Sequence, residues 1–458
     1  MIPFGLLGGF CDHLEIRITG LSEEGFSFRV PKKIEKAACL EICFFDFSAD
    51  CYRKVQLAEK EREMKLTEET PFFFIYSVWT KNGEYREQVK RLVTDYDNYI
   101  SLKLAGDDAY LSEKMVGYPA ELDEVYAESF EEQKKEWFSC IGDGIQECRN
   151  TWEHKKWNIT DLPEFELAIT IDRPELYYDF LQKDWTRFCH DYWKNNFLEH
   201  HTLSKKRVTR IYIGNQFCHN LFPRKELLFQ VLEKALENNL AVTLAFSYIR
   251  NHLLEEIDEL LQELEVWCQS REKEAGKDQE EIIVNDWAMP ILLQGKPHLK
   301  PVLGVLLNKR RKDVRLPYKQ GIGNHVDSLA ENNLNCGFYQ DYLKNTFDIQ
   351  RFEFESCGYK VTIPDGHHSL HLPFFQTNTS QYCTLYAVCR YGDRGKQKLT
   401  ENCPRYCNKK VFLYPKHLKM VGRYNSLFGY DEKILWDEKQ LQDYLEQGIE
   451  RIVVNVSL

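Results

Sequence analysis

The chain has 458 residues, of which 43% are hydrophobic and 14% aromatic, so it is globular and long enough for two or three domains with cores of their own. Its 60 Lys and Arg against 71 Asp and Glu give a formal net charge of −11, which argues against a nucleic-acid binder driven by overall charge. No apolar run approaches the roughly 20 residues that a membrane-spanning helix needs.

The amino terminus, "MIPFGLLGGFC", is apolar but lacks the Lys or Arg that precedes the hydrophobic stretch of a secretory signal peptide. We therefore interpret it as the approach to a first strand and expect a cytoplasmic protein. In the cytoplasm most of the fifteen cysteines would be reduced, so a cluster of cysteines is expected to bind metal rather than to form disulfides.

Residues 1–115 predict a small antiparallel β-barrel. In "HLEIRITGLSEEGFSFRV" apolar and polar residues alternate on both sides of a turn at residues 22–25, which is typical of a hairpin. In "FFFIYSVWTKNGEYREQVKRLV", Asn82 and Gly83 separate two apolar stretches and predict a second hairpin, because both residues tolerate positive φ.

The stretch "LSEEGFSFRV" resembles the second motif of PilZ domains, in which an Asp or Asn is followed by Ser and, three residues later, by Gly. Ser22 and Gly25 match this motif, whereas Gly20 stands at the acidic or amide position. The first PilZ motif, two arginines that grip the phosphates of cyclic di-GMP, is missing, since only Arg17 lies upstream. The resemblance implies a PilZ-like fold, but cyclic di-GMP is not an expected ligand. We expect a module that docks a protein partner.

Residues 116–204 predict a helical connector. In "DRPELYYDFLQKDWTRFCHDYWKNNF", Asp172 is a plausible N-cap and Pro174 lies in the first turn. Large apolar side chains then recur on one helical face, which is typical of core packing: Tyr177, Leu181, Trp185, Phe188 and Tyr192.

Residues 205–458 alternate between apolar runs and helical patterns. Eight runs predict strands, at 209–214, 241–246, 281–286, 300–304, 351–355, 369–374, 410–415 and 451–456. This number and the length of the segment favour a TIM-like (β/α)8 barrel. The uneven spacing leaves a doubly wound open sheet as an alternative.

Four cysteines lie between residues 383 and 407, in the pattern C-x5-C, thirteen residues, C-x3-C: Cys383, Cys389, Cys403 and Cys407. Thiolates suit zinc or an iron–sulfur cluster. The five-residue gap fits the tight turn of a zinc knuckle poorly, which favours a [4Fe–4S] cluster. Unligated thiols are the remaining alternative. The isolated cysteines, such as Cys218, Cys336 and Cys357, are expected to be small buried hydrophobes.

The segments "RIYIGNQF", "EIIVNDWAMPILLQGKPHLKPVLGVLLNKRRKDVRL" and "RFEFESCGYKV…HHSLHLPFFQTNTSQYCTLYAVC" occur in the order in which similar motifs occur in the collagenase-like peptidase family (family U-32). This resemblance covers residues 205–458. It implies a TIM-like barrel and, as in several branches, a [4Fe–4S] cluster held by the four clustered cysteines. Other branches draw one ligand from elsewhere in the chain.

The sequence contains neither H-E-x-x-H nor G-x-S-x-G, so peptidase activity is not expected. The branches with a known role resemble oxygen-independent hydroxylases of quinone precursors or RNA bases, which implies a modifying enzyme acting on a small aromatic or RNA substrate. The alternative is a regulatory or scaffolding protein with a structural metal site and a β-domain that docks a partner.

Barrel enzymes carry their active sites at the carboxyl ends of the strands. The polar residues that end apolar runs are therefore candidate site residues: Asn215, Asn285, Asp286, Glu353 and Glu355. For Asp286 a helix cap is an equal alternative to a catalytic role. The two glutamates alternate with Phe352 and Phe354, so one orientation points both carboxylates inward, to a pocket or an internal salt bridge.

The basic run "NKRRKDVRLPYK" (308–319) is either a solvated loop or an anion site for an RNA phosphate or the carboxylate of an oxygen donor. In the second case Arg311 and Arg315, with Asn285, are the expected contacts. Three histidines further along the chain, His367, His368 and His371, are not included among the predicted site residues.

Overall fold

The computed structural model describes residues 6–12, 14–34, 37–46, 49, 51–70, 73–105, 134–135, 137–138, 162–271, 279–310, 312, 330–392, 396–400, 402–413, 419–435 and 437–457. They fall into two compact units. The first holds the described residues up to 105 together with Ala330, and the second holds the others. Among the described residues, no helix is both long enough and apolar enough to cross a bilayer.

The first unit is an antiparallel sheet of seven strands in the order β5-β4-β1-β2-β3-β7-β6. Its strands are β1 (Leu7–Cys11), β2 (Leu14–Ser22), β3 (Gly25–Val30), β4 (Leu40–Asp46), β5 (Cys51–Leu57), β6 (Arg62–Glu69) and β7 (Phe74–Thr80). The predicted antiparallel strands are confirmed, but among the described residues they form a sheet with β5 and β6 at its edges rather than the predicted small barrel. The first predicted hairpin is also confirmed, because β2 and β3 pair across the turn that joins Ser22 to Gly25.

Gly25 is required by packing in this sheet. A Cβ built on Gly25 would lie only 1.9 Å from the carbonyl oxygen of Val78 on the neighbouring strand β7. The glycine that matches the PilZ motif therefore has a structural reason that involves no nucleotide.

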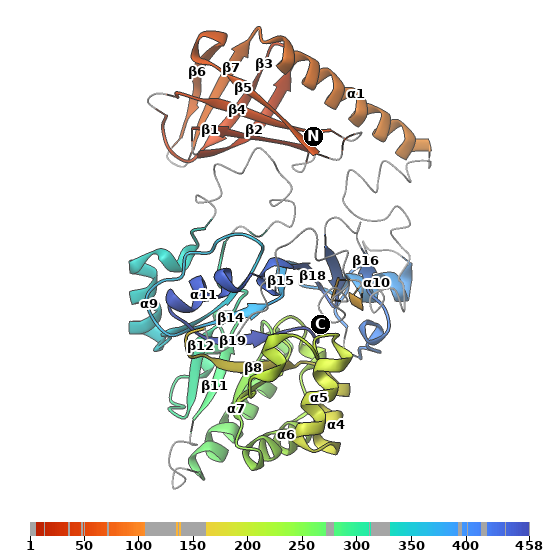
Figure 1. The fold of residues 1–458 in the computed structure, drawn as a ribbon, viewed down its shortest axis with the longest axis vertical. Helices are drawn as coiled ribbons and strands as arrows, with labels where there is room; N and C mark the ends of the chain where they lie inside the picture. Colours follow the sequence, from red (N-terminus) through yellow and green to blue (C-terminus); the bar gives the residue numbers. More distant parts are fainter. Residues whose placement is uncertain are drawn as a thin grey trace. The chain divides into compact units, whose positions relative to one another are not determined.

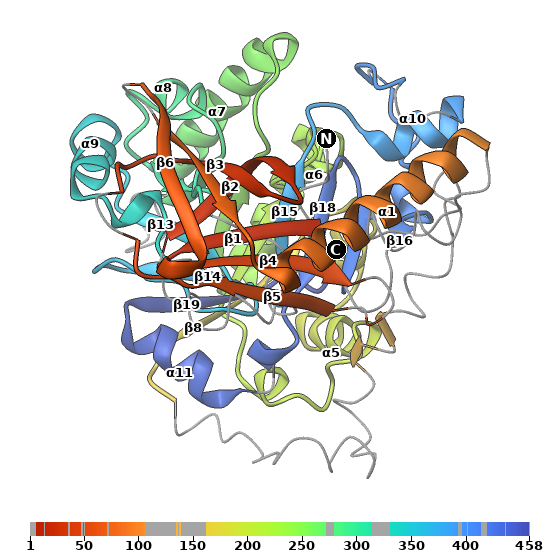
Figure 2. The same ribbon diagram turned by 90° about the horizontal axis from the view of Figure 1, so that it is seen from above.

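The second predicted hairpin, at Asn82 and Gly83, is wrong. Helix α1 (Gly83–Ala105) begins there, and Asn82 Oδ1 accepts the backbone N–H of Tyr85 at 2.9 Å, as an N-cap does. Tyr85, Val89 and Leu92 recur every three or four residues and are buried in the core of the sheet, across which α1 lies (Figure 2). A strand could not place these three side chains on one face.

The second unit contains a closed barrel of eight parallel strands in the order β10-β11-β12-β13-β14-β19-β8-β9 (Figure 1). The strands are β8 (Glu166–Ile171), β9 (Arg210–Gly214), β10 (Ala241–Ala245), β11 (Glu280–Val284), β12 (Leu299–Leu303), β13 (Arg351–Glu355), β14 (His368–Leu372) and β19 (Ile449–Val454). The described helices of their connections are α4 (Pro174–Gln182), α5 (Trp185–Asn195), α6 (Lys225–Glu237), α7 (Leu254–Gln269), α8 (Met289–Leu292), α9 (Gly337–Phe347) and α11 (Glu438–Glu446). The prediction of a parallel barrel is confirmed, and the open sheet does not form.

Seven of the eight predicted runs are barrel strands. The run at 410–415 is not one of them, since its described part contains β16 (Phe412–Leu413), which pairs antiparallel with β17 (Met420–Arg423) in a separate four-stranded sheet. The eighth barrel strand, β8, lies in the segment that was expected to be a helical connector. A short apolar run has no periodicity that separates a buried strand from a helix or from another sheet.

The helical pattern after β8 forms two helices rather than one. Helix α4 begins after Arg173, so Asp172 is not its N-cap as predicted. Asp184 caps α5 instead, accepting the N–H of Arg187 at 2.9 Å. Tyr177, Phe188 and Tyr192 are buried, as the aromatic stripe predicted.

The chain between β14 and β19 carries the four-stranded sheet, in the order β15-β18-β17-β16, and helix α10 (Thr384–Tyr391). The other two strands are β15 (Phe374–Thr379) and β18 (Ser426–Tyr430). Because β15 follows β14 almost at once, this insertion leaves the barrel at the carboxyl end of a strand, where barrel enzymes place functional groups.

Candidate functional site

Polar side chains at the carboxyl ends of the strands tie down the loops of the barrel mouth. Asn215, directly after β9, accepts the backbone N–H groups of Phe217 and Cys218 at 2.9 Å each. Asn285, directly after β11, donates to the carbonyl of Phe246 at 2.7 Å and accepts the N–H of Leu306 at 3.2 Å. These two predicted site residues therefore shape the mouth.

Asp286 is a loop and helix cap. Its Oδ1 accepts the N–H groups of Ala288 and Met289 at 3.0 Å each, and its Oδ2 accepts the N–H of Ile249. Of its two predicted roles, the cap is therefore the one that its contacts match, although the residue also lines a pocket.

Both predicted glutamates of β13 point into the barrel. Glu353 is 0% exposed, and its carboxylate lies 2.5 Å from Nε2 of His371 and 3.1 Å from the hydroxyl of Tyr212. Glu355 is 3% exposed and forms an ion pair with Lys312. Burial lowers the pKa of Lys312, while the charge of Glu355 opposes that shift. The inward orientation expected from the alternation with phenylalanine is thus present.

A separate ion network lies toward the amino ends of the strands. Glu281 lies 2.6 Å from Arg451 and 3.3 Å from Arg210, and both arginines also contact Glu166. Arg451 is only 2% exposed, and its Nη1 donates to the Tyr212 hydroxyl at 3.1 Å. Tyr212 therefore connects this network to Glu353.

Two hollows lie at the carboxyl end of the barrel. The first, which we call the interior cavity, measures about 30 Å³ and is lined among others by Asp172, Tyr212, Glu355 and His371. The second, the mouth pocket, measures about 640 Å³ and lies over the strand ends. Val305 lines both hollows, so they are neighbours.

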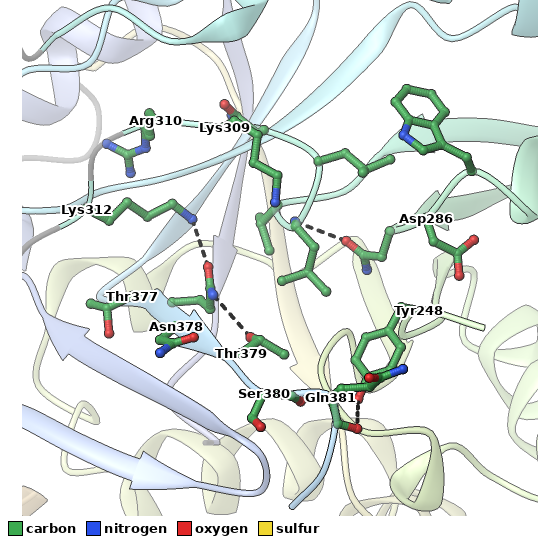
Figure 3. Close-up of a pocket in the computed structure, with 17 residues that line it drawn as sticks. Tyr248, Asp286, Lys309, Arg310, Lys312, Thr377, Asn378, Thr379, Ser380 and Gln381 are labelled. Atoms are coloured by element: carbon green, nitrogen blue, oxygen red, sulfur yellow. Dashed lines mark hydrogen bonds between the residues drawn. The ribbon is translucent and has the colours of Figure 1, made fainter. Parts of the chain in front are cut away.

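The mouth pocket has one basic side. Figure 3 shows Lys309, Arg310 and Lys312 along this side, opposite Tyr248 and Asp286. Arg310 donates to the thiol of Cys357 at 2.7 Å, and Lys312 contacts Glu355. The amine of Lys309 has no partner among the described residues. A third side is polar and follows β15 and the turn after it: Gln376, Thr377, Asn378, Thr379, Ser380 and Gln381.

The basic run predicted as an anion site thus supplies three basic side chains to the mouth pocket. The two arginines that were named for it, Arg311 and Arg315, lie outside the described residues. Lys312 belongs to the same run but was not among its expected contacts.

Three of the four clustered cysteines influence one another's pKa, and a fourth thiol that acts on them, Cys218, comes from a distant loop. Burial raises the pKa of Cys383, and the thiols of Cys218, Cys407 and Cys403 raise it further. Burial likewise raises the pKa of Cys407 to about 12 and that of Cys218 to about 11, with Cys403 again acting on both. We call Cys218, Cys383, Cys403 and Cys407 the thiol group.

Cys389 differs from the thiol group. Burial raises its pKa, and the charged group that acts on it among the described residues is Lys410. Cys383 is the N-cap of α10 and Cys389 lies in that helix, six residues further on. Six helical residues correspond to a rise of about 9 Å and a rotation of about one and two-thirds turns, which leaves the two side chains about 120° apart around the axis. Within the described residues, no group of three or more His, Cys, Asp and Glu is placed to hold one metal ion.

The remaining cysteines and histidines of interest have structural surroundings. Cys357 is buried as expected, but Cys336 is exposed, because it caps the surface helix α9. His367 is exposed and pairs with Glu450. Burial lowers the pKa of His368 to about 4, and its ring stacks on Phe352 at 4.8 Å.

Sequence reasoning missed His371, Tyr212 and Cys218. The first could have been found from alternation, since Ser369 and His371 take the same face of β14 and pair with the inward-pointing Glu353 and Glu355. Cys218 had a weaker signal, its place just after a strand end. Comparison of the chain with protein-family models, curated proteins and solved structures finds no match, so neither the family U-32 nor the PilZ resemblance gains support from a relative.

Proposed function

We propose that this protein is an iron–sulfur enzyme that modifies a small aromatic or polar molecule in the mouth pocket, with oxygen-independent hydroxylation as its reaction. The observation that carries the proposal is the thiol group beside the barrel mouth. Its members come from the loop after β9 and from the insertion between β14 and β19.

The thiols of the group are not placed to hold a single metal ion among the described residues, which argues against one zinc ion. With Zn–S bonds of about 2.3 Å, a tetrahedral zinc site needs its sulfurs within about 4 Å of one another. No described group is that tight, yet each thiol of the group is near enough to influence the charge of another. A four-iron cube accepts wider spacing. Cys383 would give up its hydrogen bond to the carbonyl of Tyr424, at 3.0 Å, to become a ligand.

The thiol group also neighbours the hollows of the barrel. Gln216 and Phe217, which immediately precede Cys218, line the interior cavity together with Phe428. The rings of Phe217 and Phe428 lie 4.8 Å apart. A centre held by these thiols would therefore lie next to the barrel mouth, where it could act on a bound substrate.

The mouth pocket supports a small-molecule substrate. Its volume of about 640 Å³ is in the range of roughly 300–1,000 Å³ that is usual for small-ligand sites. The net charge of −11 disfavours RNA as the substrate. Tyr248 and Trp287 supply aromatic faces, and Lys309 supplies a cation for a carboxylate.

In the proposed reaction a hydroxyl group moves from a carboxylate-bearing organic donor to the substrate in exchange for a hydrogen. The substrate loses two electrons and the donor gains them. When bound, the cluster would supply the redox or Lewis-acid chemistry. The residues of the chain would bind and orient the two molecules and handle protons in the pocket.

The test is anaerobic purification, followed by iron, sulfide and zinc analysis and a visible absorption spectrum. Cys218→Ser and Cys389→Ser form a matched pair of variants. We expect the first to lose more than half of the bound iron and the second to keep it, with unchanged far-UV circular dichroism in both. Because thiol protons must leave on binding, iron uptake should increase with pH.

Three outcomes would contradict the proposal. Zinc at one ion per chain without colour removes the cluster. Loss of iron in Cys389→Ser but not in Cys218→Ser returns the ligand set to the one that the sequence alone predicted. Unfolding of the barrel on loss of the metal favours a structural site, as the alternative of a scaffolding protein requires.

A further inference from the structure

The interior cavity is a polar site that no predicted role uses. Its volume of about 30 Å³ gives room for one or two water molecules, since one water needs at least roughly 10–15 Å³. It is too small for an organic substrate. What it can bind is therefore water.

His371 presents one nitrogen to a fixed partner and keeps the other available. Nε2 lies 2.5 Å from the Glu353 carboxylate, which also accepts the Tyr212 hydroxyl at 3.1 Å. Burial raises the pKa of Tyr212, so its hydroxyl stays protonated and donates. Glu353 thus remains an acceptor and fixes the proton of the ring on Nε2. Nδ1 then carries a lone pair and has no partner among the described residues.

Asp172 faces the same cavity. Its side chain is 9% exposed, and Oδ1 is buried without a hydrogen-bond partner among the described residues. A buried carboxylate oxygen in that state is costly unless water or a ligand reaches it. Its neighbour Thr170 is already bonded to Ser457 at 2.7 Å. Oδ1 of Asp172 is therefore a cavity-lining atom that still needs a hydrogen-bond donor.

We propose that the interior cavity is a proton-transfer site. Bound water exchanges protons with Nδ1 of His371, and a hydrogen bond to Oδ1 of Asp172 orients this water. When the water gives a proton to Nδ1, the electron pair of the broken O–H bond stays on oxygen. The positive charge formed on the imidazole lies against the Glu353 carboxylate. Asp172 accepts the hydrogen bond of the remaining O–H group.

Several ionisable groups surround His371. Glu353 contacts its ring, the ring of Tyr212 lies 5.5 Å away, and the carboxyl groups of Glu355 and Asp172 line the same cavity. The cation nearest to Glu355 is Lys312, which also lines the mouth pocket. The Glu355–Lys312 pair thus links the cavity to the mouth pocket, and a substrate bound there could pass protons to the site. That last use rests on the proposed function.

The decisive measurement is the protonation pattern of the histidine nitrogens, by ¹⁵N NMR of histidine-labelled protein at neutral pH. His371→Gln assigns the signal. We expect a protonated Nε2 and an unprotonated Nδ1 in wild type, and a mixed tautomer in Glu353→Gln, because a carboxamide can donate or accept. Glu450→Gln changes the carboxylate beside the exposed His367 and should leave the His371 signal unchanged.

His201 is a second control within the same chain. It is buried like His371, but its Nε2 lies 2.8 Å from the carbonyl of Leu435 and its Nδ1 accepts the N–H of Leu203 at 3.1 Å. In deuterated water the protonation pattern of the His201 nitrogens should not change in Asp172→Asn. The Nδ1 signal of His371 should shift in that variant, because a neutral carboxamide replaces the charged acceptor of its water.

A crystal structure supplies the complementary readout, an ordered water within hydrogen-bond distance of both Nδ1 and Oδ1. Protonation of both His371 nitrogens from pH 5 to 9, a proton on Nδ1 alone, or a dry cavity would each overturn the inference. Iron analysis is independent of these readouts. If the protein contains no iron but His371 shows the expected protonation pattern, the proposed function is refuted and the proton-transfer site is supported.

Discussion

Replacement of Glu281 by Gln tests the ion network inside the barrel. Burial alone would raise the pKa of Glu281, but Arg451 and Arg210 outweigh it and lower the pKa from 4.5 to about 2. A difference of about 2.5 pKa units corresponds to about 3 kcal/mol of folding free energy. The side chain is 18% exposed, so solvent screening takes little of this. The figure agrees with the roughly 3–5 kcal/mol lost when one partner of a buried pair is removed.

The sign of the pH dependence follows from the lowered pKa. The contribution of Glu281 is fully present above about pH 4.5, where the carboxyl is ionised in the unfolded chain, and is lost as the pH falls toward 2. The carboxamide of the variant never ionises. The deficit of Glu281→Gln relative to wild type should therefore be about 3 kcal/mol at pH 7 and shrink steadily below pH 4.5.

The assay is urea unfolding followed by hydrogen exchange of peptides from β11 and β19, which reports on the barrel separately from the first unit. Glu263→Gln is the matched control, because Glu263 contacts Lys225 at 3.0 Å while both side chains are about half exposed. It should change stability by less than about 1 kcal/mol. A deficit in Glu281→Gln below about 1 kcal/mol, or one that is constant from pH 7 to pH 3, would refute the reasoning.

Three further predictions concern packing, helix capping and a buried ion pair. Gly25→Ala should destabilise the first unit by about 1–3 kcal/mol in urea unfolding, because its Cβ would meet the carbonyl of Val78; an unchanged midpoint would contradict this. Asn82→Ala should cost about 1 kcal/mol in the same assay, while Asn82→Ser should keep most of the cap. Lys312→Met should cost about 3–5 kcal/mol in barrel stability by leaving Glu355 buried and unpaired, and addition of Glu355→Gln should recover part of the loss. Additive losses would show that the two side chains do not interact.

The barrel could be predicted from the sequence because its strands are covered on both faces. Such strands form short continuous apolar runs, and seven runs were recognised for that reason. The same property explains the two errors. The run at 166–171, ELAITI, is apolar like the other strands but directly precedes a strong helical pattern, to which its segment was assigned. The run at 410–415 looks like a barrel strand although Phe412 and Leu413 belong to another sheet.

The candidate site was less readable because its members meet only after the barrel closes. Glu353 and Glu355 could be assigned to the interior from their alternation with phenylalanine. By contrast, the nearness of Cys218 to Cys383 joins residues 165 positions apart, and no local pattern reports it. The Asn82–Gly83 pair shows the opposite failure, in which a strong local turn signal yields to the burial of Tyr85 and Val89 on one helical face.

The polar groups inside the barrel differ between its two ends. At the amino end, Glu166 and Glu281 contact Arg210 and Arg451, so the buried charges compensate one another. At the carboxyl end, Asp172 keeps an oxygen without a partner in the described part of the chain, next to a cavity of about 30 Å³. The amino end also keeps an atom without a partner among the described residues, Nη1 of Arg351 beside Glu281. What distinguishes the carboxyl end is that Glu355 lines the interior cavity and its partner Lys312 lines the mouth pocket, which supports the proposal of a site there.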